Sequence, residues 1–219
     1  MPKVIEFLKE HKILLLNDYN AHFYEINKML ATDILATNGI DVPYTYGIFS
    51  TSLIPELQYP VIIKPNCGGR TNLTYIIKEE TDIFSILDEI ASFEMIVQKY
   101  IQPEFITRIE VIDKECKLIL KRSVCDNGLS AYKYGSTYEF YPDCSQYIKN
   151  TAIKVMDILD IQMGSMDIIE YDGKAYIIDV NSVSNTSEDC TELFQFDLML
   201  ETAKFIFKKC LSLENSGNN

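Results

Sequence analysis

The sequence predicts an α+β fold, and three observations support this prediction. Short apolar segments bounded by Gly, Pro, Asn or Asp recur along the 219 residues, and such segments are typical of β-strands. Longer segments have apolar residues three and four positions apart, which is typical of amphipathic helices. The two kinds of segment alternate, and two pairs of strand segments are joined by short polar turns. This combination indicates α+β or mixed α/β architecture.

The first half of the chain contains strand patterns and two helical patterns. Residues 22–38 have helical spacing and are followed by Gly39, a typical helix stop. A second helix is predicted over residues 82–93, with Asp82 as a candidate N-cap. Pro43 favours extended backbone around it. The predicted strands are Lys12–Leu16, Ile40–Phe49, Pro60–Pro65, Leu73–Lys78 and Met95–Ile101.

The second half contains two predicted hairpins. Residues 107–124 form two strand patterns joined by the polar Asp113-Lys114-Glu115, and residues 163–181 form two more around Asp172-Gly173. The other segments are a polar, tyrosine-rich stretch at 125–147, helices at 148–161 and 195–211, and a disordered tail at 214–219.

Charge and composition narrow the classes of function. The formal net charge of −12 argues against nucleic-acid binding, and any anionic ligand needs locally placed cations. No run of 18 apolar residues occurs and the N-terminus is highly charged, so neither a membrane span nor a signal peptide is predicted. Six cysteines without a CxxC pair indicate reduced thiols in a cytoplasmic protein. Because His11 and His22 are the only histidines, Ser/His or Cys/His catalysis is not expected.

A glycine turn follows a lysine at the end of a predicted buried strand. Lys64 is followed directly by Pro65 and then by Asn66-Cys67-Gly68-Gly69-Arg70-Thr71. A buried lysine is costly unless it meets an anion, and glycines let backbone N–H groups approach phosphate oxygens. The alternative is an ordinary glycine turn beside a lysine that extends to solvent. These residues taken alone favour that alternative, because glycine motifs often occur without a phosphate site.

Polar residues interrupt the apolar strands of the second hairpin. Asp179 and Asn181 share one face of their strand because strand side chains alternate, and Asp167 lies on the preceding strand. Two carboxylates and an amide oxygen suit Mg²⁺, which favours a metal site over solvent-facing strand ends.

The metal hypothesis also constrains the turn at Asp172-Gly173. A strict two-residue turn would set Asp179 opposite Met166, with Asp167 and Asp179 on opposite faces. A three-residue loop with a bulge would set the two aspartates opposite each other. The metal hypothesis therefore predicts the bulged turn.

In this order the motifs resemble those of the ATP-grasp ligases, nearest to the RimK-like and glutathione-synthetase-like branch. The resemblance runs from about Leu16 to Asn185. NKMLATDILATN resembles the helix with the first phosphate-binding lysine, and PVIIKP resembles the strand with the second. IVQKYI resembles the hinge strand that binds adenine through its backbone, and GSMDIIE…YIIDVN resembles the paired metal-binding strands. The arginine in TRIEV stands where the family usually has one near the γ-phosphate.

The resemblance implies roles for individual residues. By position, it implies phosphate binding by Lys28, Lys64, Gly68 and Gly69, adenine binding by Gln98, Lys99, Tyr100 and Ile101, ribose binding by Glu104, phosphoryl-transfer catalysis by Arg108 and Arg122, and binding of Mg²⁺ (or Mn²⁺) by Asp167, Asp179 and Asn181.

The chain departs from the family pattern in several places. Ile106 stands where a ribose-binding acid is usual, so Glu104 is expected to reach back in its place. The loop that is rich in Arg and Asn in the family is replaced by residues 123–142. Arg122 and Lys133 are the remaining cations there, with solvated surface charge as an equally good interpretation.

The resemblance also implies a domain layout with two α/β subdomains that sandwich the nucleotide. We predict a remnant of a preceding domain at 1–18, an N-terminal subdomain at 19–100, a C-terminal subdomain with the metal site at 101–213, and a disordered tail at 214–219. The usual Rossmann-like domain before the first lysine helix is not expected in this chain.

The implied activity is ATP-dependent ligation of a carboxylate to an amine, or to a thiol, through an acyl phosphate. The expected substrate is a small molecule or peptide with a carboxylate, with residues 127–142 and 182–188 facing it. One alternative is a nucleotide-binding module that ligates nothing and serves as a regulatory or complex-forming subunit. A third, weaker interpretation is that Cys67 acts as a nucleophile. A small buried cysteine in a loop is the favoured interpretation of this residue.

Overall fold

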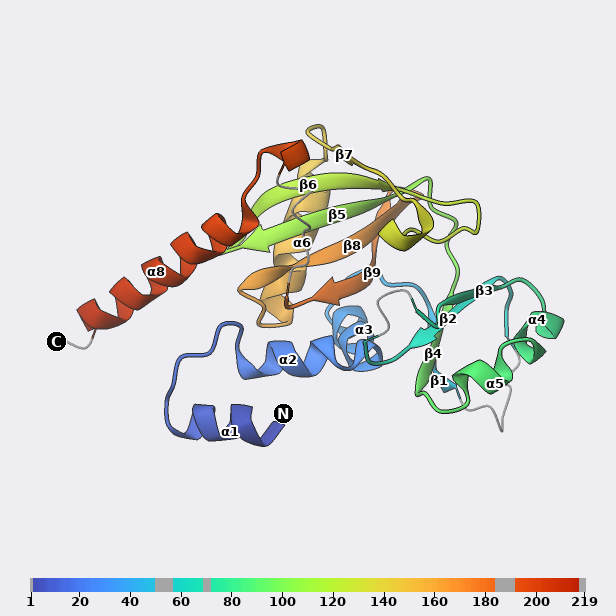
Figure 1. The fold of residues 1–219 in the computed structure, drawn as a ribbon, viewed down its shortest axis with the longest axis horizontal. Coiled ribbons are helices and arrows are strands. Elements are labelled where there is room, and N and C mark those ends of the chain that lie inside the picture. Colours follow the sequence, from blue (N-terminus) through green and yellow to red (C-terminus); the bar gives the residue numbers. More distant parts are fainter. Residues whose placement is uncertain (1, 50–56, 69–71, 184–191, 217–219) are drawn as a thin grey trace.

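A computed structural model describes residues 2–49, 57–68, 72–183 and 192–216, and two antiparallel sheets dominate it (Figure 1). The four-stranded sheet has the order β1-β4-β2-β3 and the five-stranded sheet the order β7-β6-β5-β8-β9. The smaller sheet comprises β1 (Thr45–Phe49), β2 (Val61–Pro65), β3 (Tyr75–Ile77) and β4 (Met95–Lys99). The larger sheet comprises β5 (Phe105–Ile112), β6 (Glu115–Ser123), β7 (Tyr138–Phe140), β8 (Met163–Tyr171) and β9 (Lys174–Asn181). The predicted α+β class is confirmed.

Helices cover one face of each sheet (Figure 1). The smaller sheet is covered by α4 (Glu80–Phe84) and α5 (Leu87–Ile90). The larger sheet shares its core with α6 (Gln146–Ile158), α2 (Tyr19–Glu25) and α3 (Lys28–Thr37). Of the terminal helices, α1 (Pro2–Glu10) lies alongside α2, and α8 (Leu198–Ser216) packs its first turns against the end of β5 before it projects from the molecule (Figure 1). Among the described helices, none is long and apolar enough to cross a membrane.

Strand alternation leaves the second face of the larger sheet free for polar side chains. On β5, Ile109 and Val111 are buried in the core with α6, so Arg108 and Glu110 lie on the opposite face. On β8, the same alternation places Asp167 on that opposite face. This open face carries most of the predicted site.

The predicted strand at Lys12–Leu16 is wrong. These residues form a turn and irregular backbone, and Ile13 and Leu14 are about half exposed, at 49% and 45%. No described strand pairs with them, so an apolar segment alone did not suffice to make a strand. Asn17 anchors the segment instead: its buried side chain donates to Met163 O and Ser182 O.

The predicted helix at residues 22–38 is divided in two. The division falls at Asn27, whose side chain caps α3 by accepting a hydrogen bond from Leu30 N at 3.0 Å. Asn66, next to β2, accepts from the first two N–H groups of α3, those of Lys28 and Met29. This cap makes Lys28 the first residue of α3 and ties it to the end of β2.

Two further helix boundaries differ from prediction. Residues 82–93 form the two short helices α4 and α5, and the N-cap is Glu79 rather than Asp82. Asp82 accepts from the backbone N–H of Lys78 and Glu79 as the partner in a capping box. At the C-terminus, α8 continues to Ser216, into the predicted tail, and residues 217–219 lie outside the described part.

The β8–β9 hairpin reaches the predicted register by a different route. Asp172 and Gly173, with φ of 50° and 71°, form a strict two-residue turn in which Tyr171 pairs with Lys174. The predicted bulge in the turn is therefore wrong. The extra residue is Ile178, because the register shifts within β9 after Ile168 pairs with Ile177. Beyond this bulge Asp167 pairs with Asp179, as the metal hypothesis requires.

Candidate active site

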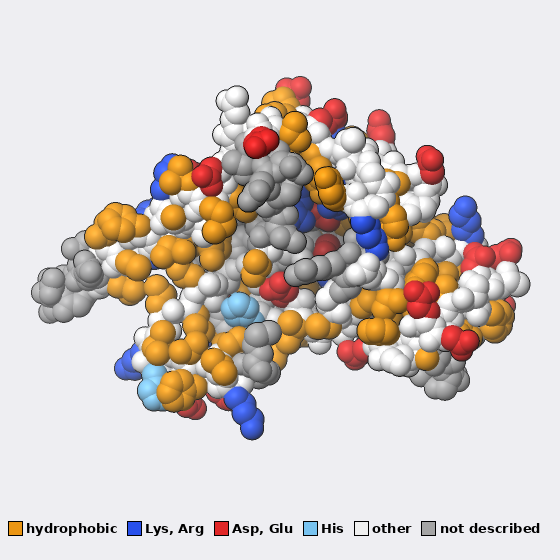
Figure 2. Space-filling model, viewed as in Figure 1, with side chains coloured by type: hydrophobic (Ala, Val, Ile, Leu, Met, Phe, Trp, Pro, Cys, Tyr) orange, Lys and Arg blue, Asp and Glu red, His pale blue; other side chains and the backbone are white. Residues whose placement is uncertain are grey.

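A cavity of about 630 Å³ lies between the open face of the larger sheet and the ends of β2 and β4. In the space-filling view, side chains of both charges gather in the hollow at the centre of the molecule (Figure 2). The predicted site residues that line this cavity are Lys28, Lys64, Gly68, Gln98, Lys99, Tyr100, Ile101, Arg108, Arg122, Asp167, Asp179 and Asn181.

Lys28 enters the cavity from the first turn of α3. Its Nζ lies 2.6 Å from Asp179 Oδ1, and both side chains are largely buried. Burial lowers the pKa of the Lys28 ammonium, but the Asp179 carboxylate outweighs burial and the pKa is raised overall. Burial raises the pKa of Asp179, and Lys28 with Lys64 outweighs that effect and lowers it. Both groups are therefore charged at neutral pH.

Lys64 binds the backbone at the bulge of β9. Its Nζ donates to Ile178 O at 2.8 Å. A bulge residue is left out of the regular ladder of strand hydrogen bonds, so Lys64 supplies a partner at this point. Burial lowers the pKa of Lys64 to about 8, and the nearby Asp179 carboxylate offsets part of that effect.

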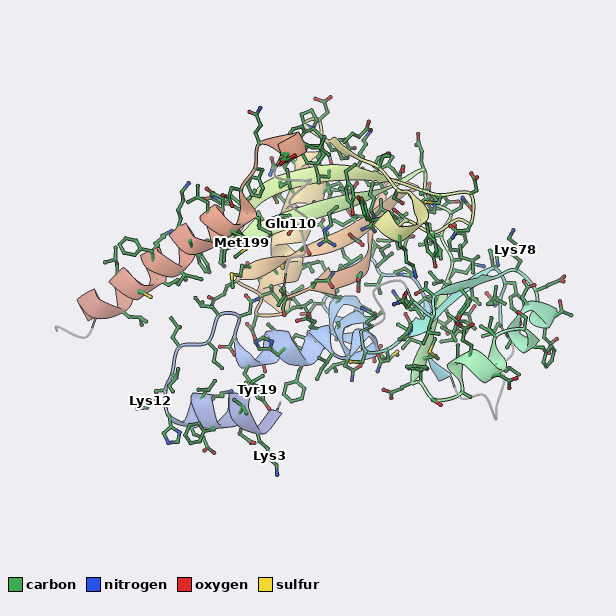
Figure 3. All side chains as sticks on the ribbon, in the orientation of Figure 1. Lys3, Lys12, Tyr19, Lys78, Glu110 and Met199 are labelled. Atoms are coloured by element: carbon green, nitrogen blue, oxygen red, sulfur yellow. The ribbon has the colours of Figure 1, made fainter. Side chains whose placement is uncertain are left out.

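Asp167 is held by two arginines on the open face of the larger sheet. Arg108 Nη1 donates to Asp167 Oδ1 at 3.2 Å, and Arg122 Nη2 donates to Oδ2 at 2.7 Å. Burial raises the pKa of Asp167, but Arg122 and then Arg108 outweigh it and lower the pKa. Glu110 accepts from Arg108 Nε at 3.0 Å and is 1% exposed (Figure 3). Arg108 is thus fixed from two sides.

The predicted metal ligands form a consistent set of oxygen donors. Asp167 and Asp179 are directly paired across β8 and β9, and Asn181 follows Asp179 on the same face. The Asn181 amide lies beside the Asp179 carboxylate, with Nδ2 at 3.4 Å from Oδ2. Two carboxylates and one amide side chain share a face of two neighbouring strands, so the types of donor present fit Mg²⁺.

Comparison with known families agrees with this arrangement. The sequence model of the RimK-like ATP-grasp domain matches residues 25–205. The chain belongs to the RimK-like ATP-grasp family. The predicted family resemblance is therefore confirmed over most of the chain.

Individual relatives of this ATP-grasp chain are ligases. A D-alanine–D-alanine ligase of Clostridium beijerinckii is 24% identical over 75% of the chain, and the chain spans 60% of the relative's length. The crystal structure of the D-alanine–D-alanine ligase from Bacillus anthracis superposes with a TM-score of 0.68 at 18% identity, over 82% of this chain and 64% of that one. The ATP-grasp ligase PsnB, complexed with a minimal precursor, gives 0.66 at 19% identity, over 90% of this chain and 65% of that one. These structures confirm the ATP-grasp fold.

The predicted hinge residues Gln98, Lys99, Tyr100 and Ile101 line the cavity. The N–H groups of Lys99 and Tyr100 donate to Tyr44 O and Pro60 O, at 2.8 and 3.1 Å. The Ile101 N–H makes no such bond to any described residue, so it remains available to a ligand. Apolar side chains also line the cavity: Ile62 from the smaller sheet, Ile106, Leu120 and Ile169 from the larger sheet, and Leu129 from the segment after β6. Ile106 and Ile169 stand two residues from Arg108 and Asp167, so they share the open face of the larger sheet.

Two sequence predictions, for Glu104 and Cys67, do not fit the structure, and Lys133 matches the second of its two interpretations, solvated surface charge. Glu104 is exposed and does not line the cavity, because it lies in the irregular segment before β5. Lys133 is exposed and donates to Asn72 Oδ1 at 2.7 Å, so it is no cavity cation. Cys67 is exposed rather than buried. Gly69 and residues 184–188 of the predicted substrate side lie outside the described residues.

The cavity also contains polar residues that the sequence analysis missed. Glu110 and Glu25 both line it, and Ser182 donates to Glu25. Ser130 accepts from Arg122 Nε at 2.8 Å and so orients that arginine. Glu110 could have been found from its spacing, because it lies two residues beyond Arg108 on the same strand face. Glu25 lies within the helical pattern at residues 22–38, but that pattern does not show which residues face the cavity. Ser130 lies in the stretch at 125–147, which has no regular pattern.

We expect nucleotide affinity to depend on the protonation of Lys64. Its pKa of about 8 means that it is only half charged at pH 8, and a phosphate beside it raises the pKa again. Binding of Mg-ADP at pH 8 should therefore take up about half a proton, and affinity should fall as pH rises further. Calorimetry in two buffers with different ionisation enthalpies measures this uptake.

The matched control for this experiment is Lys133→Met, which removes an exposed lysine outside the cavity. Lys64→Met should abolish the proton uptake, and Lys133→Met should leave it unchanged. An equal uptake in Lys64→Met would show that another group titrates.

Proposed function

We propose that this chain catalyses ATP-dependent ligation of a carboxylate to an amine through an acyl phosphate. One observation carries the proposal: a single cavity brings two lysines and two arginines against a pair of cross-strand carboxylates. Membership of the ATP-grasp family and the ligase activity named for the relatives support it.

The charged side chains of the site are paired with protein groups that nucleotide and metal could replace. Each cation already binds a protein oxygen: Lys28 binds Asp179, Lys64 binds Ile178 O, and the two arginines bind Asp167. In the proposed complex the carboxylates turn to Mg²⁺, and the four cationic side chains turn to phosphate oxygens. Every buried charge then keeps an opposite partner, which avoids the cost of an unpaired buried charge.

Each side chain has a role in this complex. Lys28 and Lys64 neutralise the α- and β-phosphates, and the Ile101 N–H binds the adenine edge. Arg108 and Arg122 stabilise the transferring phosphoryl group, for which no protein nucleophile is needed. Asp167, Asp179 and Asn181 would hold Mg²⁺, which would supply neutralisation of phosphate charge.

The proposed reaction has two steps. The substrate carboxylate attacks the γ-phosphorus and ADP leaves, which gives an acyl phosphate. The amine then attacks the acyl carbon, loses a proton, and phosphate leaves. We propose an amino acid or a peptide as the carboxylate substrate, supported by relatives that ligate D-alanine and by a neighbour in complex with a precursor peptide.

ADP release tests the reaction class. The protein is incubated with Mg-ATP, hydroxylamine as a general nucleophile, and single amino acids of either configuration or short peptides. We expect ADP release that depends on one group of carboxylates and yields the hydroxamate. Nucleotide binding without release on any carboxylate would favour the alternative, a nucleotide-binding module that ligates nothing.

The double variant Asp179→Ala/Asn181→Ala tests the metal assignment separately. We expect it to lose the Mg²⁺-dependent part of ATP affinity, measured by titration with and without Mg²⁺. Asp157→Ala is a matched control, because Asp157 on α6 forms an exposed ion pair with Lys114. Unchanged Mg-ATP affinity in the double variant would refute the assignment.

A further inference from the structure

Ser165 occupies a defined position beside the proposed metal ligands. It lies on β8 two residues before Asp167 and therefore on the same face of the sheet. It pairs directly with Asn181 on β9, as Asp167 pairs with Asp179. The four side chains thus stand at the corners of one rectangle on the sheet, and three of the corners are the proposed ligands.

The Ser165 hydroxyl is an unusual group within this rectangle. The residue is 0% exposed, and its Oγ has no hydrogen-bond partner among the described residues. Buried hydroxyls are nearly always bonded, because an unpaired one costs stability. Unlike Ser165, its two cross-strand neighbours have hydrogen-bond partners. Glu110 on β5 accepts from Arg108, and Asn181 on β9 donates to Asp179.

Packing alone does not explain the hydroxyl of Ser165. Gly164, the preceding residue, faces the other side of the sheet, so the 2.3 Å between a Cβ at Gly164 and the backbone O of Asn181 does not limit the space at Ser165. The Ser165 side chain is itself 0% exposed. An alanine here would be buried in the same way without burying an unpaired oxygen, so burial leaves the hydroxyl unexplained.

We propose that the Ser165 hydroxyl is the fourth oxygen donor of the divalent-cation site. The proposal rests on the proposed function, because it takes Asp167, Asp179 and Asn181 as the cation ligands. Mg²⁺ and Mn²⁺ prefer oxygen donors, and the hydroxyl gains in the occupied site the partner that it lacks without the cation. Glu110, Ser165 and Asn181 lie side by side on β5, β8 and β9. With the cation bound, each of these three polar side chains has a partner.

Two readouts on Ser165→Ala test this role together. Without ligand, the variant should be as stable as the wild type or melt about 2–4 °C higher, because it loses an unpaired buried hydroxyl. With ADP present, its affinity for Mn²⁺ should fall about 10-fold or more, measured from the electron paramagnetic resonance signal of free Mn²⁺.

Ser136→Ala is the matched control. Ser136 is also buried, but its hydroxyl accepts from Ala131 N at 2.9 Å. This variant should melt at a lower temperature and bind Mn²⁺ like the wild type. The two variants are therefore expected to differ both in melting temperature and in Mn²⁺ affinity.

The outcomes separate this proposal from the proposed function. Equal Mn²⁺ affinity in Ser165→Ala and wild type would overturn the role of Ser165 alone. Failure of the wild type to bind Mn²⁺ with ADP would overturn the metal site as well. Ser165→Cys gives a second measurement: its thiol should raise affinity for Cd²⁺ relative to Mn²⁺, and an unchanged ratio would count against ligation.

Discussion

Asp167→Asn should destabilise the ligand-free protein by about 3–5 kcal/mol. Asp167 is the shared partner of Arg108 and Arg122, and the side chains of all three residues are 9–13% exposed. The substitution keeps the shape but leaves two buried guanidinium groups without their common counter-charge. Urea denaturation in the absence of nucleotide measures the loss directly.

Inorganic phosphate should restore part of this loss, because an anion in the cavity can pair with both arginines. Asp157→Asn is the control: its ion pair with Lys114 has side chains that are 48% and 70% exposed, so the cost should stay below about 1 kcal/mol. Similar losses in the two variants would mean that burial of the Asp167 network contributes little.

Arg108→Met should lower kcat about 10²–10³-fold with a much smaller change in the KM for ATP. In the proposed complex Arg108 keeps its bond to Glu110, so its guanidinium is preorganised beside the position that we propose for the transferring phosphoryl group. A preorganised charge acts mainly in the transition state, which is why kcat should respond more than KM. The rate of ADP release with the best carboxylate found above is the measurement.

Arg108→Lys distinguishes charge from geometry. It keeps the positive charge but loses the planar fork that binds two carboxylates at once, so it should recover only part of the rate. Thermal melts of both variants exclude unfolding as the cause. A wild-type kcat in Arg108→Met would remove Arg108 from the catalytic machinery.

Much of the site was readable from the sequence because its motifs are local. Lys64 stands at the end of one apolar strand, and Asp179 and Asn181 stand two residues apart on another strand. The positions of these polar residues in apolar strands therefore sufficed to predict that they bind ligands. The order of the motifs then indicated the family. The prediction that Glu104 binds the ribose did not fit the cavity, because no regular pattern sets the direction of its side chain in the segment before β5.

The partners of these residues were not readable. The ion pairs of Lys28 with Asp179 and of Arg122 with Asp167 join residues 151 and 45 positions apart. Such contacts depend on how the sheets and α3 pack, which no local pattern specifies. Ser165 was missed for a similar reason, because only the strand register shows that it stands beside Asn181.

In the β8–β9 hairpin, the sequence predicts the strands, and the tertiary structure sets the position of the bulge. The sequence determined two strands and a turn at Asp172-Gly173, and the metal hypothesis required that Asp167 and Asp179 share a face. It did not determine where the extra residue goes, because a bulge in the turn and one within the strand give the same final pairing. The tertiary structure places the extra residue at Ile178, where Lys64 from the other sheet binds the carbonyl. The hydrogen bond that accompanies this choice comes from a residue 114 positions away, so only the folded chain could reveal it.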